Sequence, residues 1–158
     1  MGQTSTTSSA ASSTTTTAGQ TGSAPPCPIV ATVVLDALRM HFLPKHFGAD
    51  MMLAEATVYD FMGALCRSYR GGFWDFIELS NGGFYMQLRG EGPLPISVSM
   101  GNGYSGELSH DAASITATLF ALNRLVHRGL DRFDDAYYRL LDFAAYHPER
   151  AEIFNAID

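Results

Sequence analysis

The segment Gly103-Tyr104-Ser105-Gly106-Glu107 comes closest to a catalytic motif in this chain. It resembles the G-x-S-x-G nucleophile elbow, in which a strained turn between a strand and a helix exposes a serine hydroxyl for attack on a carbonyl. The final glycine of the motif is missing. In enzymes with this motif an acid and then a histidine follow the serine, and here only Asp131 or Asp134 with His147 could fill these places. A serine hydrolase that uses Ser105 is therefore kept as an alternative function.

Other residues are of types that could form a catalytic, metal or phosphate site, but their spacing in the sequence does not fit such a site. Ser109-His110-Asp111 holds the residue types of a catalytic triad, but neighbours at a helix start point in different directions. His41 and His46 match no common metal-ligand spacing, and no cysteine or histidine pair completes a set. Lys45 is the only lysine, so the chain has no phosphate-binding loop of the G-x-x-x-x-G-K-[ST] type. We expect neither a metal nor a cofactor.

A binding surface is the stronger prediction, and it lies in a hairpin over residues 73–88. Asn81-Gly82 between two β-rich runs is the strongest short-range hairpin signal, and it favours a type I′ turn. The turn sets the register, because a one-residue slip would exchange the two faces. The predicted cross-strand pairs are Leu79 with Phe84, Ile77 with Met86 and Asp75 with Leu88.

One face of this hairpin combines aromatic and polar residues. Trp74, Phe76 and Tyr85 would lie beside Glu78 and Arg89, which is the composition of protein-interaction surfaces. The alternative is that a helix or residues 29–48 cover this face. Cover is the interpretation that we favour, because so short a sheet must pack on something.

Two glycine-rich loops complete the set of candidate contact residues. Asn81-Gly82-Gly83 and the segment from Asn102 to Glu107 are turn-forming, and simple turn geometry also explains their composition. The full set of predicted interaction residues is Trp74, Phe76, Asn81, Gly82, Gly83, Tyr85, Asn102, Tyr104 and Glu107.

The remaining elements follow from hydrophobic periodicity and predict an α+β fold, a small antiparallel meander built on the hairpin and packed with about four helices. The segment from Arg39 to Gly48 is expected to be an irregular connector, because Pro44 interrupts regular structure. A strand over Ile96–Met100 should extend the hairpin into the meander. The other expected elements are a strand over Ile29–Leu35, helices over 51–67 (with Asp50 as N-cap), 110–128 (capped by Ser109) and 132–146, and a short helix after Pro148.

Composition limits the class of protein. The chain has 158 residues, 46% of them hydrophobic and 16% charged, which suits a single domain over residues 29–158. Residues 1–28 are rich in Ser and Thr, and we expect them to be a disordered tail. The net charge of −6 argues against a nucleic-acid binder, and it is too small to copy the charge density of DNA. The chain has only two cysteines, and it shows no transmembrane run and no signal peptide. We therefore expect a cytoplasmic protein that is not associated with a membrane.

Several ordered blocks together resemble the ArdB/KlcA family of antirestriction proteins. The similarity runs over roughly residues 36–158 and excludes the tail. The blocks are Met40–Gly48, Glu55–Tyr59 with Leu65-Cys66, Tyr69–Trp74, Leu79–Met86, Asn102–Ser109 with Asp111–Ala113, Thr118–Leu122, His147–Glu149 and Ala156–Asp158.

This resemblance implies a function that the residues alone do not give. Members of the family relieve type I restriction of incoming unmodified DNA, which helps a plasmid or other mobile element to establish in a new host. It implies a compact α+β domain without the dense negative surface of DNA mimics, and our first hypothesis is that this domain acts through non-enzymatic contacts with protein. The implied partner is the host type I restriction machinery or a factor that controls it. A plasmid-maintenance binding module is kept as a further alternative.

Overall fold

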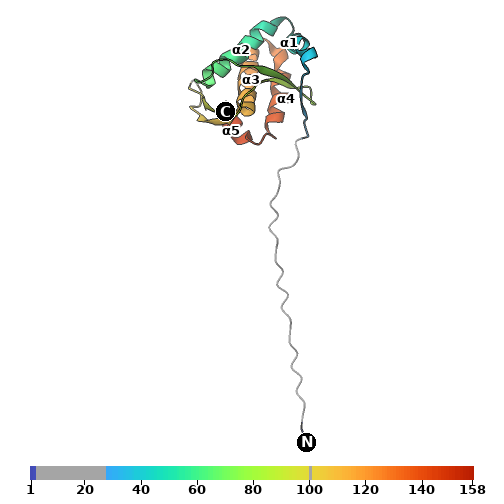
Figure 1. Ribbon diagram of the computed structural model, residues 1–158, viewed down its shortest axis with the longest axis vertical. Coiled ribbons are helices and arrows are strands. Elements are labelled where there is room, and N and C mark those ends of the chain that lie inside the picture. The colour runs from blue at the N-terminus through green and yellow to red at the C-terminus, as the bar shows by residue number, and fades with distance from the viewer. Residues whose placement is uncertain (3–27, 100) are drawn as a thin grey trace.

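The computed structural model describes residues 1–2, 28–99 and 101–158, and Figure 1 shows one body of helices around small sheets. The α+β class predicted from the sequence is confirmed. The predicted tail over residues 1–28 lies almost wholly outside the described residues and stays a prediction. The strands are β1 (Ala31–Val33), β2 (Trp74–Leu79), β3 (Phe84–Leu88), β4 (Pro93–Ser97) and β5 (Ser105–Ser109). The α-helices are α1 (Arg39–Phe47), α2 (Met51–Leu65), α3 (His110–His127), α4 (Asp134–Ala144) and α5 (Arg150–Ile157).

The β2–β3 hairpin forms as predicted, but its register differs by one residue. Phe76 pairs with Met86, and Ile77 pairs with Tyr85. The loop has three residues instead of two, because Gly82 N–H bonds to Leu79 C=O and Leu79 N–H bonds to Gly83 C=O. Gly82 has φ +82°, and no other residue type in the described chain has positive φ. Asn81 therefore does not adopt the conformation of a type I′ turn, and a type I turn with a glycine bulge takes its place.

The new register changes which side chains share a face of the sheet. Residues paired directly across an antiparallel sheet point to the same side. Trp74, Phe76 and Glu78 therefore share a face with Phe84, Met86 and Leu88. The opposite face holds Asp75, Ile77 and Leu79 with Tyr85 and Gln87. The predicted aromatic face is thus divided between the two sides of the sheet.

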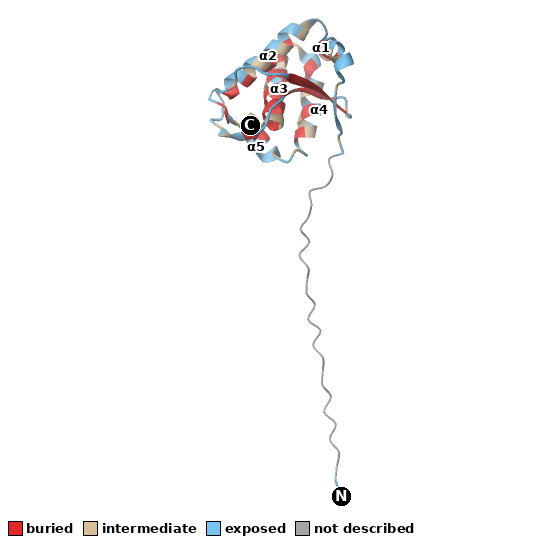
Figure 2. Ribbon diagram, viewed as in Figure 1, coloured by how far each residue is buried: buried red, intermediate tan, exposed pale blue. Residues whose placement is uncertain are grey.

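Helices cover both sides of this sheet, which confirms the interpretation of a covered face. On one side Phe42 of α1 stacks on Phe76, with ring centroids 4.4 Å apart. On the other side Tyr85 stacks on Phe143 of α4 at 5.9 Å. Figure 2 shows the buried residues gathered where the sheet and the helices meet. The sheet is therefore the middle layer of the core.

The third strand of this sheet is β1, not the predicted strand after the hairpin. Strand order is β1-β2-β3, while β4 and β5 form a separate two-stranded antiparallel sheet. At the outer edge of β3, Leu88 N–H donates to Ser114 Oγ of α3 at 2.9 Å. The meander prediction for residues 96–100 is wrong, because β4 pairs with β5 and not with the hairpin.

The segment predicted as an irregular connector is a helix. α1 runs from Arg39 to Phe47 and contains Pro44. Proline removes one intrahelical hydrogen bond, which is costly inside a helix. The helix forms because its inner face buries Phe42 and Phe47, each 1% exposed, against the sheet. Burial of two phenylalanines outweighs the lost hydrogen bond.

The central helix of the fold is α3, and its predicted cap is confirmed. Ser109 Oγ accepts a hydrogen bond from Ala112 N–H at 3.1 Å. Asp50 occupies the predicted N-cap position of α2, but its side chain makes no capping bond and pairs with Arg132 instead. α2 also ends at Leu65, two residues before its predicted end.

Among the described residues, no helix is both long and apolar enough to cross a membrane.

Candidate functional site

Two of the predicted contact residues are core residues. Trp74 is 5% exposed and Phe76 is 7% exposed. The Trp74 indole N–H donates to the Tyr69 hydroxyl at 3.1 Å, and Tyr59 of α2 lies against the same ring. Burial raises the pKa of the Tyr59 phenol, and its hydrogen bond to Glu55 adds to that shift. The Trp74 and Phe76 side chains are therefore covered and offer almost no surface to a partner.

Tyr85 is buried on the opposite side of the sheet, where it begins a polar network. Its hydroxyl donates to Asp111 Oδ1 at 2.8 Å, and Gln87 Nε2 donates to the same oxygen at 2.9 Å. Burial raises the pKa of Tyr85 far above its ordinary value, and the nearby charge of Asp111 raises it further. The phenol therefore serves as a fixed hydrogen-bond donor that joins β3 to the start of α3.

The network continues from Asp111 to the segment before α5. His147 Nε2 lies 3.3 Å from Asp111 Oδ2, and His147 Nδ1 accepts from the Glu149 N–H at 3.0 Å. Glu149 also accepts hydrogen bonds from the backbone N–H and the hydroxyl of Ser109. One chain of hydrogen bonds thus fixes α5 to the N-terminus of α3. No feature of the sequence other than residue type signals this network.

The predicted hydrolase constellation is not assembled. Ser105 lies inside β5, paired with Ser97, and not at a turn between a strand and a helix. Both ring nitrogens of His147 are engaged by Asp111 and the Glu149 N–H. His147 therefore has no free nitrogen to take a proton from a serine hydroxyl.

The Asn81 loop is fastened to α4. Asn81 Oδ1 accepts from the Gly83 N–H at 2.9 Å, and Asn81 Nδ2 donates to the Arg139 carbonyl at 2.8 Å. A side chain at Gly82 would collide with the Arg139 guanidinium, and one at Gly83 would lie 3.0 Å from Arg139 Cβ. The positive φ of Gly82 favours glycine there, and the close approach of α4 leaves little space for a side chain at Gly83, so turn geometry and packing explain much of this motif.

The second glycine-rich loop is fastened to α5 in the same way. Asn102 Oδ1 accepts from the Tyr104 N–H at 2.9 Å, and Asn102 Nδ2 donates to the Asn155 carbonyl at 2.6 Å. The Tyr104 hydroxyl donates to Glu152 Oε2 at 2.7 Å, and burial with this contact raises the pKa of Tyr104 to about 12. Glu107 is exposed on β5. Asn102 and Glu107 are thus at the surface, while Tyr104 is half-buried.

Asp75 gathers two arginines that the sequence did not bring together. Arg89 binds it in a bidentate manner at 2.5 and 2.8 Å, and Arg39 Nη1 lies 3.5 Å from it. Both guanidinium groups stack over the Phe73 ring, at 4.4 and 4.6 Å from its centroid. The hydrogen bond to Asp75 raises the pKa of Arg89. Arg39 was missed because its helix was predicted as a connector.

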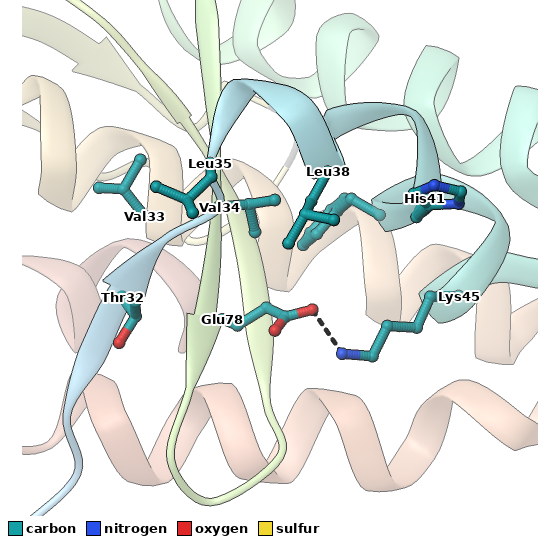
Figure 3. Close-up of a pocket in the computed structure, with 9 residues that line it drawn as sticks. Thr32, Val33, Val34, Leu35, Leu38, His41, Lys45 and Glu78 are labelled. Atoms are coloured by element: carbon teal, nitrogen blue, oxygen red, sulfur yellow. Dashed lines mark hydrogen bonds and ion pairs between the residues drawn. The ribbon is translucent and has the colours of Figure 1, made fainter.

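An exposed apolar surface surrounds β1, and we call Val33, Leu35 and Leu38 the β1–α1 surface. Their side chains are 52%, 70% and 52% exposed. They lie around a hollow of about 370 Å³ between β1 and α1, and Lys45 reaches across it to Glu78 at 2.7 Å (Figure 3).

Glu78 also accepts from His46 at 2.8 Å. Its hydrogen bonds to Lys45 and His46 lower the Glu78 pKa, whereas burial lowers the pKa of His46. The charges at this hollow are therefore satisfied within the protein. His41 lines the hollow, and no three His, Cys, Asp or Glu side chains in the described part of the chain gather as metal ligands.

Comparison with known proteins agrees with these features. The family model for "Antirestriction protein" matches residues 67–158. The antirestriction protein KlcA of Escherichia coli is 51% identical over 141 residues, which cover 84% of this chain and 96% of that protein. The putative antirestriction protein YubI of Escherichia coli K12 is 37% identical over 128 residues, covering 76% and 89%.

A solved structure has the same fold. KlcA and ArdB, the proteins described with that structure, show a novel fold. They have antirestriction activity against type I DNA restriction systems in vivo but not in vitro. The TM-score is 0.78 at 48% identity, over 83% of this chain and 96% of that one. The similarity therefore extends over nearly the whole of these relatives.

Proposed function

Because this chain belongs to the ArdB/KlcA family of antirestriction proteins, we propose that it relieves type I restriction of incoming unmodified DNA by non-enzymatic contacts with protein. The observation that carries this proposal is the match over 96% of KlcA at 51% identity, with a shared fold at a TM-score of 0.78. The activity described for KlcA and ArdB, present in vivo but not in vitro, favours a mechanism that needs other cellular components.

The geometry of the polar residues supports a non-enzymatic mechanism. The serine of the near-elbow lies within a strand, and the candidate base His147 is held by Asp111 and the Glu149 backbone. Asp111 itself accepts hydrogen bonds from two donors of β3. These groups are engaged in holding helices together, which is a structural role.

The charges support contacts with protein more than imitation of DNA. Duplex DNA carries about one negative charge per 1.7 Å of helix axis. This chain carries a net charge of only −6, and several acids are neutralised locally. Asp75 binds two arginines, Asp50 binds Arg132 and Glu78 binds Lys45. Because these carboxylates are paired with arginine or lysine, they do not act as free negative charges that could imitate the phosphates of DNA.

The partner that we propose is the host type I restriction machinery or a factor that controls it, met in the cytoplasm. The predicted contact residues that remain at the surface are Gly82, Asn102 and Glu107. A partner can reach these three without any change in the core. Asn102→Ala that folds normally and stays fully active would remove this residue from the candidates.

The test is the plating of unmodified phage on cells with an active type I system, with and without this protein. We expect plating to rise by orders of magnitude when the protein is present. A Ser105→Ala variant should be as active as the wild type. Unchanged plating with soluble wild-type protein would reject the proposed function. Loss of activity in Ser105→Ala together with loss of labelling by a serine-reactive probe would favour the hydrolase.

A further inference from the structure

A second apolar surface runs along the outer junction of α2 and α3. Its main cavity has a volume of about 590 Å³ and extends toward the C-terminal end of α3. A neighbouring cavity of about 350 Å³ shares Phe61, Ala64 and Phe120 with it. We call this surface the α2–α3 groove, defined by Leu53, Phe61, Ala64, Phe120, Arg124 and Arg128.

The floor of the groove is a pair of aromatic rings. Phe61 of α2 and Phe120 of α3 are stacked, with centroids 5.5 Å apart and planes at 17°. Both side chains are only half-buried, and Leu53 beside them is 39% exposed. The small side chain of Ala64 leaves the space above these rings open. Partly exposed aromatic rings at the centre of an apolar hollow are typical anchors of protein interfaces.

The charged end of the groove consists of two arginine side chains. Arg124 lies in the last turn of α3, Arg128 is the C-cap residue four positions later, and both line the same cavity. Both residues are exposed, and within the described chain neither guanidinium group takes part in a hydrogen bond or an ion pair. Asp60 is the one acid that lines the main cavity, so the lining has a net positive charge in a protein of net charge −6.

We propose that the α2–α3 groove binds an acidic amphipathic helix of a host protein. The apolar side of that helix would rest on Phe61 and Phe120, and its Asp or Glu side chains would pair with Arg124 and Arg128. α2 has 15 residues and spans about 22 Å, enough for about four turns of a partner helix. This inference rests on the proposed function, because the bound protein would be the one through which restriction is relieved.

Two other occupants fit less well. Residues 3–27 of this chain contain no charged, aromatic, Leu, Ile or Val residue, so their composition matches neither the rings nor the arginines. A nucleic-acid strand would stack bases on the phenylalanines, but Asp60 and the net negative charge oppose a phosphate backbone. An acidic helix satisfies both the rings and the arginines.

The first test reverses the charge of the groove. Arg124→Glu with Arg128→Glu should lower phage plating by about tenfold or more relative to wild type, with a melting temperature close to that of the wild type. The matched control is Arg67→Glu with Arg150→Glu, because these arginines are also exposed and make no side-chain ion pair in the described chain. The control should retain wild-type plating. Full activity of the groove variant, or an equal loss in the control, would overturn the inference.

The second test does not depend on phage plating. The photoreactive residue p-benzoylphenylalanine is placed at position 64 in the groove, and at position 91 as an exposed control. After irradiation of living cells, mass spectrometry identifies the cross-linked peptide. The inference is supported if an acidic amphipathic helix is cross-linked from position 64 but not from position 91, and if this cross-link is lost in the Arg124→Glu, Arg128→Glu variant. A cross-link to nucleic acid, a cross-link to a second copy of this chain, or no cross-link overturns it.

The two tests separate the two proposals. If wild-type protein fails to restore plating, the proposed antirestriction function falls, and the cross-link alone decides whether the groove binds an acidic helix. If wild-type protein restores plating but the groove variant does so equally, the function stands and the groove is not its contact surface.

Discussion

The β2–β3 hairpin and the α2–α3 groove contain the same residue types but have different roles. Both combine aromatic rings with arginines. In the hairpin, Trp74 and Phe76 are covered by helices, and the nearby Arg39 and Arg89 are both paired with Asp75. In the groove the rings are half-buried and the two arginines are unpaired within the described chain. Exposure and charge pairing, and not composition, therefore distinguish a core from a contact surface.

The largest expected effect comes from the covered side of this comparison. Phe76→Ala removes a ring that is 7% exposed and stacked on Phe42 at 4.4 Å. The cavity left behind should lower the free energy of unfolding by about 3–5 kcal/mol. Chemical denaturation measures this loss. Phe120→Ala is the matched change in the groove, where a half-buried ring should cost less; equal losses would remove the distinction.

A smaller effect is expected from the ion cluster of the hairpin. Asp75→Asn keeps the shape of the side chain but removes the charge that Arg39 and Arg89 share. The Arg39 guanidinium would remain largely buried without a counter-ion, at a cost of about 1–3 kcal/mol. Thermal unfolding measures the change. Unfolding at the wild-type temperature would show that the cluster contributes no net stability.

How far the sequence predicted this structure depends on the range of the interactions involved. The helix over 110–128 and its Ser109 cap were predicted because helical periodicity and capping are local signals. The hairpin was placed correctly, but its register failed because Asn81 bonds to Arg139, 58 residues away, and does not adopt positive φ. The helix around Pro44 was missed because tertiary burial of Phe42 and Phe47 outweighs the local effect of proline.

The candidate site was predicted less well than the fold, for the same reason. The sequence placed Tyr85 on a face with the composition of an interaction surface, yet Tyr85 is 2% exposed and donates to Asp111 at the start of α3. The groove was not predicted at all. Phe61 and Phe120 lie in two helices that are far apart in the sequence, and nothing in the sequence shows that their rings stack or that both stay partly exposed. Its arginines look like ordinary helix-terminal residues until their lack of partners in the described structure is known.

The covered side should also carry a dependence of stability on pH. Burial lowers the pKa of His46 below its ordinary value of 6.5, although its hydrogen bond to Glu78 opposes this shift. Below that pH the unfolded chain takes up a proton that the folded chain does not, so the free energy of unfolding falls as the pH decreases from about 6.5. Denaturation of wild type and His46→Gln at about pH 7.5 and about pH 5.5 tests this sign. The variant should lose less stability on acidification; parallel losses would assign the effect to other groups.

The smallest expected effect on stability is in the groove, where the expected effect on function is largest. Arg124→Glu with Arg128→Glu changes exposed side chains that make no ion pair within the described chain. Surface changes of this kind alter the free energy of unfolding by about 0.5 kcal/mol or less. A modest additional loss can arise because the arginines favour the C-terminal end of the α3 dipole. Denaturation midpoints of the double variant and of the Arg67→Glu, Arg150→Glu control should therefore be nearly equal. A large loss restricted to the groove variant would mean that its arginines, like those around Asp75, maintain the fold, and the contrast between the two regions would disappear.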